Sequence, residues 1–427
     1  MTVSWLDLPA DTLFGVHNLP YGVFSAPGAA GDRRLGVAVG DLVLDAAAAA
    51  RATGLDGRLT ELLAASSLNP LLAAGRADWT RVRAALTGWL TDPGHRAAVE
   101  PCLLPRAGVV LHLPFEVGDY VDFYASEHHA ANLGRLFRPG SEPLTPNWKH
   151  QPIGYHGRSG SVVVSGTPVV RPNGQRKAPA DAVPSLGPSR RLDIEAEVGF
   201  VVGAPAALGE PVPLAAFADH VFGVCLVNDW SARDIQAWEY VPLGPFLGKS
   251  FATSVSPWVV PLDALGPARI APPARDVEPL PYLDDRGGSD PWGLDLALEV
   301  RLNGTTVSRP PFAAMYWTAA QQLTHMTVNG AGLRPGDLFA SGTVSGPDRG
   351  TEGALIELTW NGERPVKLAD GSVRSFLEDG DEVVVTATAP GPDGTRIGFG
   401  EVTGRVLPAV PAPGAGTGHR DAAPHGG

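Results

Sequence analysis

Hydrophobic and polar positions alternate in short blocks along most of the chain. Short apolar runs recur between connections that are rich in glycine and proline, a pattern typical of β-strands separated by turns. The runs that predict strands are Gly108–Phe115, Ser161–Val170, Asp193–Gly203, Val221–Asp229, Ser256–Leu262, Leu296–Val307, Ala354–Glu363, Asp381–Ala389 and Arg396–Val406. Asn303-Gly304 and Asn361-Gly362 are signals for tight hairpin turns. Many strands with few helices predict a sandwich or a roll.

The N-terminal part of the chain has a different texture. Asp45–Leu90 is rich in alanine and leucine at helical spacing, which predicts a smaller domain of strands and helices. Val99–Gly108 is interpreted as a linker, and Ala313–Val328 as the clearest later helix. The predicted division is residues 1–110, residues 111–410, and a disordered tail of proline, glycine and alanine over residues 411–427.

Composition narrows the class of protein. The 427 residues are 44% hydrophobic and 18% charged, with a net charge of −12, so the chain can bury a core and offers no basic stripe for nucleic acid or anionic membranes. Two cysteines, Cys102 and Cys225, lie in apolar runs and are predicted to be small buried hydrophobes. The N-terminus lacks a signal-peptide pattern and no run is long enough to span a bilayer, so a cytoplasmic location is expected.

Carboxylates interrupt two of the predicted strands. In Leu192–Phe200, alternation places Asp193, Glu195 and Glu197 on one face. On this segment alone a solvated face is the favoured interpretation, and a hard divalent cation with oxygen ligands is the alternative. Glu357 stands in the apolar run Ala354–Glu363, where burial requires a partner such as an imidazole, or else an edge-facing position.

The segment after Val221–Val227 also carries polar groups. Asp229 ends that strand and is either a ligand-binding carboxylate or the N-cap of the following helix, at about even odds. Arg233 and Gln236 lie three residues apart and therefore share a helix face, although an exposed ion pair also explains the arginine. Leu243 stands where a phosphate-binding loop ending at Gly248 requires glycine, which excludes that motif.

The stretch Val121–Arg138 combines an aspartate, a tyrosine, two adjacent histidines and two arginines. Asp122 and His129 are seven residues apart, so a helix through both would place them on one side. A lone histidine is more often a structural hydrogen-bonding group than a base, and Arg138 is either a surface charge or a clamp for a carboxylate.

Together these segments resemble the fumarylacetoacetate hydrolase family, with similarity from about Leu111 to Leu407. The motifs that carry the resemblance are Asp122–Arg138, Pro146–Val169, Leu192–Phe200, Val227–Phe251, Ser256–Leu265, Leu333–Pro347 and Asp379–Val385. The N-terminal part fits more loosely the small SH3-like barrel domain of that family. The tail and the variable segment Arg275–Leu296 depart from the pattern.

The resemblance implies a mainly β (α+β) fold, in which a small SH3-like barrel domain precedes a large mixed β-sandwich roll, and a homodimer. It implies hydrolysis of a carbon–carbon bond in a small β-diketo acid, giving fumarate and acetoacetate in the last step of tyrosine and phenylalanine breakdown, with Mg²⁺ or Ca²⁺ as cofactor. The implied metal site comprises Asp122, Glu195, Glu197 and Asp229, supported by Lys249 and Thr253.

The same resemblance implies roles around the reacting bond. His129 would be the base and Glu357 its orienting partner, with Arg233, Gln236 and Lys249 stabilising oxyanion charge. The residues implied to hold substrate are Tyr124, Arg138, Tyr155, Gln236, Tyr240 and Thr343.

Two other functions compete with this one. The first is a related enzyme for 2-oxo or β-diketo acids, such as an acylpyruvate hydrolase, a decarboxylase or an isomerase. These usually lack the N-terminal domain and the stretch Trp238–Phe251, which this chain has. The second is an inactive cation-binding structural protein, which predicts loss of the base and the oxyanion donors; this chain keeps them.

Overall fold

The computed structural model describes residues 4–286 and 292–412. Its N-terminal part contains a five-stranded antiparallel sheet in the order β4-β3-β2-β1-β5, covered by helices as the alanine- and leucine-rich spacing predicts. The strands are β1 (Tyr21–Ser25), β2 (Arg34–Val39), β3 (Leu42–Asp45), β4 (Leu103–Pro105) and β5 (Val110–His112). The helices are α1 (Ala46–Thr53), α2 (Gly57–Leu63), α3 (Asn69–Ala73), α4 (Arg76–Thr91) and α5 (Arg96–Val99).

The interpretation of Val99–Gly108 as a linker is wrong. Leu103–Pro105 forms β4, which pairs with β3, and Val110–His112 forms β5, which pairs with β1. The proline in this segment does not exclude a strand, because proline is compatible with an edge strand such as β4. The sheet is joined to the rest of the molecule through Tyr21, whose amide donates to the Val259 carbonyl at 2.9 Å.

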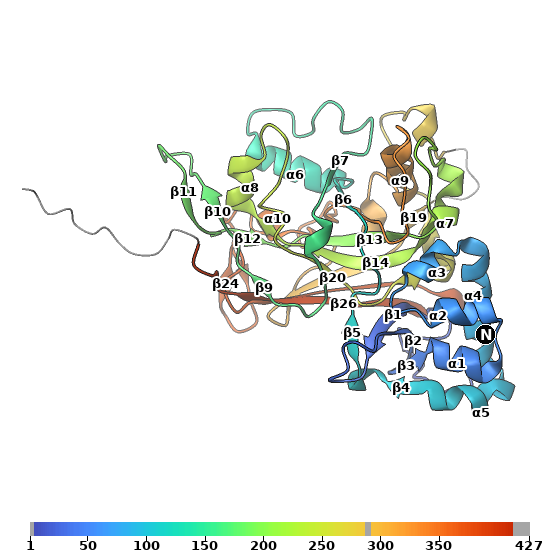
Figure 1. Ribbon diagram of the computed structural model, residues 1–427. Helices are drawn as coiled ribbons and strands as arrows, with labels where there is room; N and C mark the ends of the chain where they lie inside the picture. Colours follow the sequence, from blue (N-terminus) through green and yellow to red (C-terminus); the bar gives the residue numbers. More distant parts are fainter. Residues whose placement is uncertain (1–3, 287–291, 413–427) are drawn as a thin grey trace, which may run out of the picture.

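The larger part of the chain contains two main sheets that face each other (Figure 1). The first is mixed and follows the order β7-β6-β22-β13-β14-β16-β8, with β17 also pairing β14; β6 runs parallel to β22, and β8 parallel to β16. Its strands are β6 (Tyr120–Phe123), β7 (Gly154–His156), β8 (Val162–Val164), β13 (Ala196–Val202), β14 (Val221–Asp229), β16 (Thr253–Val255), β17 (Val260–Pro261) and β22 (Leu338–Ala340).

The second sheet follows the order β21-β20-β25-β26-β9. Its strands are β9 (Val169–Val170), β20 (Ala297–Leu302), β21 (Thr305–Ser308), β25 (Glu382–Pro390) and β26 (Arg396–Leu407). Buried and half-buried residues alternate along β25, so only one of its faces packs on the core, whereas β13 and β14 are buried at every position. The first sheet is therefore the central layer, with the second sheet on one face and helices on the other.

Shorter elements complete the sandwich. Two-stranded ribbons join β10 (Asn173–Arg176) to β11 (Ser185–Pro188), β12 (Leu192–Asp193) to β15 (Ser231–Ala232), β18 (Arg269–Ile270) to β19 (Gly293–Leu294), and β23 (Val366–Lys367) to β24 (Val373–Arg374). The remaining helices are α6 (Glu127–Phe137), α7 (Phe217–His220), α8 (Arg233–Glu239), α9 (Ala319–Thr327) and α10 (Leu355–Leu358). In Figure 1, α6 and α8 lie above β13 and β14, on the side away from β20 and β26.

The predicted mixed β-sandwich roll is confirmed, and several local predictions are corrected. Asn303-Gly304 joins β20 to β21 with positive φ at both residues, as a tight hairpin requires. Asn361-Gly362 does not form a hairpin, because Leu355–Leu358 is helix α10 and not a strand. A short apolar run cannot be assigned to strand or helix by periodicity alone.

The predicted helix Ala313–Val328 is shorter in the structure, because α9 begins at Ala319 behind the capping residue Thr318. Most of the predicted tail, from residue 413 onward, lies outside the described residues. Among the helices that the structure describes, none has the length and apolar composition needed to cross a bilayer.

Candidate active site

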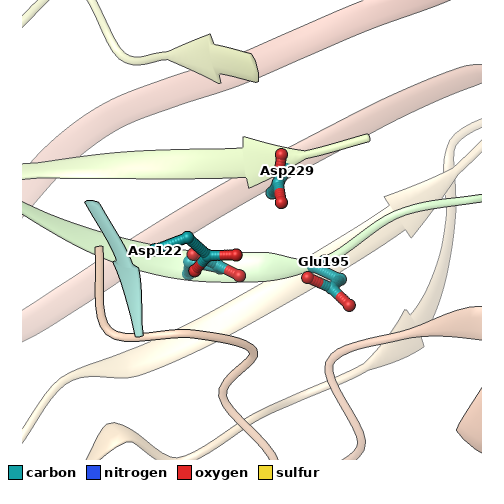
Figure 2. Close-up of side chains that lie close together, drawn as sticks. Asp122, Glu195 and Asp229 are labelled. Atoms are coloured by element: carbon teal, nitrogen blue, oxygen red, sulfur yellow. The ribbon is translucent and has the colours of Figure 1, made fainter. Parts of the chain in front are cut away.

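Four buried carboxylates meet where three strands of the central sheet end. Asp122 lies on β6, Glu197 on β13 and Asp229 at the end of β14, and Glu195 directly precedes β13. Each contributes one oxygen atom to a set in which all atoms lie within 4.8 Å of one another. Figure 2 shows the carboxyl groups of Asp122, Glu195 and Asp229 around a common space. The solvated-face interpretation of Glu195 and Glu197 is therefore wrong.

The electrostatics of this carboxylate cluster favour a bound dication. Neither carboxylate oxygen of Glu197 has a hydrogen-bond partner within the described residues, and neither has Oδ1 of Asp122. Burial raises the pKa of both carboxyl groups well above their ordinary values, and the neighbouring carboxylates raise it further. Buried carboxylates with open oxygens are the donor set that hard divalent cations prefer. The residues present therefore fit a divalent metal ion.

Two cationic side chains border the cluster on one side. The ammonium group of Lys249 contacts Glu195 and lies 2.9 Å from Oδ2 of Asp229, while Nη2 of Arg233 lies 2.8 Å from Oε1 of Glu195. Burial alone would raise the pKa of Glu195, but the charges of Lys249 and Arg233 lower it below its ordinary value. Thr253 donates to Oδ1 of Asp229 at 3.0 Å. Glu195 is thus favoured in its ionised form, whereas burial raises the pKa of Asp229 above its ordinary value despite the bonds from Lys249 and Thr253.

Asp229 is not a helix cap. The N-cap position of α8 is Ala232, which makes no side-chain capping bond, and Asp229 instead receives bonds from Lys249, Thr253 and, at 3.4 Å, the hydroxyl of Tyr155. Arg233 and Gln236 share a face of α8 as predicted, with Nη1 of Arg233 donating to Oε1 of Gln236 at 3.2 Å. That arginine is buried, so the exposed ion pair is excluded.

A histidine and a glutamate form a buried pair beside the carboxylate cluster. Nδ1 of His129 lies 2.6 Å from Oε2 of Glu357. Because an ionised carboxylate can only accept, Nδ1 carries the proton and Nε2 is left with its lone pair free. Nε2 lies 3.8 Å from Oε1 of Glu195, so it faces the carboxylate cluster. Asn132 and Ser345 also donate to Glu357, both at 3.0 Å, which fixes the carboxylate's orientation.

The geometric premise that linked Asp122 to His129 is wrong, although the two residues do meet. Asp122 belongs to β6 and His129 to α6, which begins behind the N-cap Ser126, so no helix contains both. The strand and the helix bring them to the same cavity. His128 is half-buried and does not line that cavity.

The predicted substrate-binding residues all line one cavity of about 360 Å³. These residues are Tyr124, Arg138, Tyr155, Gln236, Tyr240 and Thr343, and the same walls include Asp122, His129, Glu195, Arg233 and Lys249. Tyr124 packs edge-on against the His129 ring, and the hydroxyl of Thr343 is buried without a partner in the described chain. Arg138 donates to the Pro143 carbonyl at 2.9 Å. Glu197, Asp229, Thr253 and Glu357 do not line the cavity.

Sequence reasoning missed three residues at this site and misplaced a fourth. Asn132 follows His129 by three residues, so helical spacing could have placed it beside the same partner. Tyr120 precedes Asp122 by two residues on β6, and its buried hydroxyl has no partner among the residues described. Ser345 carries no signal in the sequence. Asp193 was placed on the face of Glu195, but it contacts Arg233 and not the other carboxylates.

A sandwich that carries a buried carboxylate cluster, with a histidine–glutamate pair beside it at one cavity, defines an enzyme whose site can hold a divalent metal. The family model "Fumarylacetoacetate (FAA) hydrolase C-terminal" matches residues 120–407, and "Fumarylacetoacetase N-terminal" matches residues 17–114. The chain belongs to the fumarylacetoacetate hydrolase family.

Curated relatives cover nearly the whole chain. Fumarylacetoacetase of Homo sapiens is 47% identical over 96% of this chain and 99% of its own length, and that of Arabidopsis thaliana is 44% identical over the same shares. Among solved structures, fumarylacetoacetate hydrolase from Exiguobacterium antarcticum has a TM-score of 0.53 at 18% identity, covering 91% of this chain and 99% of that one. Maleylpyruvate hydrolase from Sphingobium sp. SYK-6 has a TM-score of 0.51 at 17% identity, covering 92% and 100%. These structural likenesses concern the fold.

Proposed function

We propose that this protein hydrolyses fumarylacetoacetate to fumarate and acetoacetate, the last step of tyrosine and phenylalanine degradation. One observation carries the proposal: the free Nε2 of His129 faces the carboxylate cluster in the cavity that also holds Arg233 and Lys249. The full-length similarity to curated fumarylacetoacetases supports the choice of substrate.

His129 takes a proton from the attacking water through Nε2. Imidazole suits this role because its ordinary pKa lies near neutrality. Glu357 accepts the Nδ1 proton at 2.6 Å, which holds the ring in the tautomer that leaves Nε2 unprotonated. Its charge also stabilises the imidazolium that forms.

Asp122, Glu195, Glu197 and Asp229 would hold a divalent cation, which we propose is Mg²⁺ or Ca²⁺ because every ligand is a carboxylate oxygen. When bound, the cation would supply Lewis-acid stabilisation of the negative charge that develops on the leaving group. Lys249 and Thr253 orient the Asp229 carboxylate by donating hydrogen bonds to its two oxygens. Four carboxylates outweigh one dication by two charges, and Arg233 with Lys249 offset that excess.

Arg233, Gln236 and Lys249 stabilise the tetrahedral oxyanion. All three line the cavity, and Gln236 uses its carbonyl oxygen to accept from Arg233, which leaves its amide group to donate. Donors held in place before the reaction are effective because they need no reorganisation. The water-derived oxygen stays on the fumaroyl side, and the carbon–carbon bond breaks as its electrons pass into the enolate of the leaving group. The proton held by His129 then passes to the enolate carbon, which gives acetoacetate and restores the base.

Tyr124, Arg138, Tyr155, Gln236, Tyr240 and Thr343 bind the substrate in this scheme. Arg138 is suited to bind a terminal carboxylate, since its Nη2 donates to a backbone carbonyl and the guanidinium carries further donors. We also retain as proposals a homodimer, a cytoplasmic location, and the division between residues 1–110 and 111–410.

Incubating the purified protein with three candidate substrates tests the function. The substrates are fumarylacetoacetate, a simple acylpyruvate, and a 2-oxo acid that could only decarboxylate or isomerise. Mg²⁺ or Ca²⁺ is added to each reaction, and the products are identified. We expect fumarate and acetoacetate from the first, at a kcat/KM above that for the acylpyruvate. A higher kcat/KM for one of the other compounds would assign the chain to a different reaction of the family.

A further inference from the structure

Asp193 is a fully buried carboxylate that the proposed mechanism does not use. It ends β12 and pairs with Ser231 of β15, and its side chain is 0% exposed. Leaving a carboxylate uncompensated in such a place is strongly unfavourable. The groups that donate hydrogen bonds to Asp193 therefore indicate which parts of the site this carboxylate holds in place.

Each carboxylate oxygen of Asp193 accepts a hydrogen bond from a backbone amide at the start of α10. Oδ1 accepts from the Leu355 amide at 2.7 Å and from the Ile194 amide at 2.8 Å, and Oδ2 accepts from the Ile356 amide at 3.1 Å. The N-cap residue of α10, Ala354, has no side-chain oxygen to bind these amides. A residue about 160 positions earlier in the chain thus fixes the short helix that carries Glu357.

The same carboxylate holds Arg233. Oδ2 accepts from Nε of Arg233 at 2.7 Å, while Nη2 of that arginine points to Oε1 of Glu195 at 2.8 Å and Nη1 donates to Gln236 at 3.2 Å. The planar guanidinium has a fixed fork of donors, so holding Nε sets the direction of both terminal nitrogens. Asp193 therefore determines where the Arg233 charge lies in the cavity.

We propose that Asp193 is a positioning residue that holds the oxyanion-stabilising Arg233 and the base-orienting Glu357 in one fixed relation. Arg233 and α10 come from distant segments, and within the described chain Asp193 is bonded to both. The water that His129 activates and the oxyanion that Arg233 stabilises must be brought together at one carbonyl. The expected changes in kcat rest on the proposed function, whereas the positioning of Arg233 and α10 by Asp193 does not.

Asp193→Asn tests the proposal because it keeps the side-chain shape. Each oxygen of Asp193 accepts two hydrogen bonds. In either orientation the asparagine NH₂ group, which can only donate, would therefore face two N–H donors. We expect kcat to fall by about 10²-fold, the size of losing one oxyanion donor, with KM changed by less than about three-fold.

Asp381→Asn is the matched control. Asp381 is also buried, pairs with Arg374 at 2.9 Å, and accepts from the Glu378 amide at 2.7 Å and from Asn303 at 2.8 Å, but unlike Arg233 none of these partners lines the cavity. Both variants should lower Tm, and the control should keep kcat within about two-fold. If the two variants lower kcat equally at a temperature where both are folded, Asp193 is merely structural and the proposal is wrong.

A double-mutant cycle gives a second kinetic readout. Because Asp193 acts partly through Glu357, the kcat losses of Asp193→Asn and Glu357→Gln should combine to less than their product. Fully multiplicative losses would contradict the coupling. If Asp193→Asn does not fold, Asp193→Glu keeps the charge and displaces it by one methylene. That variant should lose at least about ten-fold in kcat, and wild-type kcat in it would overturn the proposal.

Amide hydrogen exchange separates this proposal from the proposed function, since it needs no substrate. In Asp193→Asn the Leu355 and Ile356 amides should exchange about ten-fold faster or more, while the Glu378 amide is unchanged. Faster exchange without any fumarylacetoacetate hydrolysis in the wild type would support the positioning and reject the function. Unchanged exchange at Leu355 and Ile356 would show that Asp193 does not hold α10.

Discussion

Nδ1 of His129 and Oε2 of Glu357 are 2.6 Å apart in a part of the molecule from which water is nearly excluded, although 228 residues separate them in the chain. The pairing turns an ordinary imidazole into a base with a fixed tautomer. It also explains why a glutamate interrupts an apolar run at Ala354–Leu358. The predictions below follow from this pair and from the carboxylate cluster beside it.

Replacing His129 should remove the base while leaving the binding groups in place. His129→Ala should lower kcat by about 10²–10⁴-fold, the usual contribution of general base catalysis, with little change in KM. Steady-state kinetics measure this directly. His128→Ala is the matched control, because the neighbouring ring does not line the cavity, and it should keep kcat within a few-fold. An inactive His128→Ala beside an active His129→Ala would reverse the assignment.

Replacing Glu357 should act through the histidine. Glu357→Gln keeps the size of the side chain but removes the charge that stabilises the imidazolium, so kcat should fall less than in His129→Ala. The double variant should be scarcely slower than His129→Ala alone, because the two groups act as one unit. Multiplicative losses in kcat would show that Glu357 has an effect independent of His129.

Glu197 provides the sharpest test of the cation site, because neither of its oxygens has another partner in the described residues. Glu197→Gln should raise the Kd for Mg²⁺ or Ca²⁺ by about ten-fold or more, measured by calorimetry on chelator-treated protein. Glu210→Gln, at an exposed position, is the control and should leave the Kd unchanged. Equal cation affinity in all three proteins would show that the ion binds elsewhere.

The chelated protein should lose stability as pH rises. Burial and neighbouring carboxylates raise the pKa of Asp122 and Glu197, so the folded protein binds more protons than the unfolded chain above about pH 4. Stability from these groups is present below that pH and is lost as pH rises through the raised pKa values. Tm measured from pH 5 to 8 should fall with chelator and fall less with Mg²⁺ or Ca²⁺. The same Tm profile in both conditions would contradict this account.

The cysteines should be dispensable for the reaction. Burial raises the pKa of the Cys225 thiol, and burial together with the charge of Asp45 raises that of Cys102, so both disfavour the reactive thiolate. Cys225 is buried as predicted, but Cys102 is only half-buried. The double alanine variant should keep kcat within a few-fold, and any loss should appear in Tm. A large loss of kcat in a stable double variant would reveal a nucleophile that the mechanism lacks.

The sequence predicts the sandwich well because runs such as Val221–Asp229 are short, apolar and rich in valine, a composition that favours buried strands. It predicts the carboxylate cluster only through resemblance, since alternation along Leu192–Phe200 taken alone favours a solvated face. Glu357 was assigned to a strand because a helix of four residues has no period to detect. The bonds of Asp193 to Arg233 and to α10 depend on tertiary packing, and no local pattern reports them.

The central claim is that water activated by His129 cleaves the carbon–carbon bond of fumarylacetoacetate. Turnover in ¹⁸O-labelled water with added Mg²⁺ or Ca²⁺, followed by mass spectrometry of the products, tests it most directly. We expect fumarate that carries one ¹⁸O atom per turnover, and about 10²-fold less of it in the same time from His129→Ala. Unlabelled fumarate, no fumarate from the wild type, or equal label from His129→Ala would contradict it.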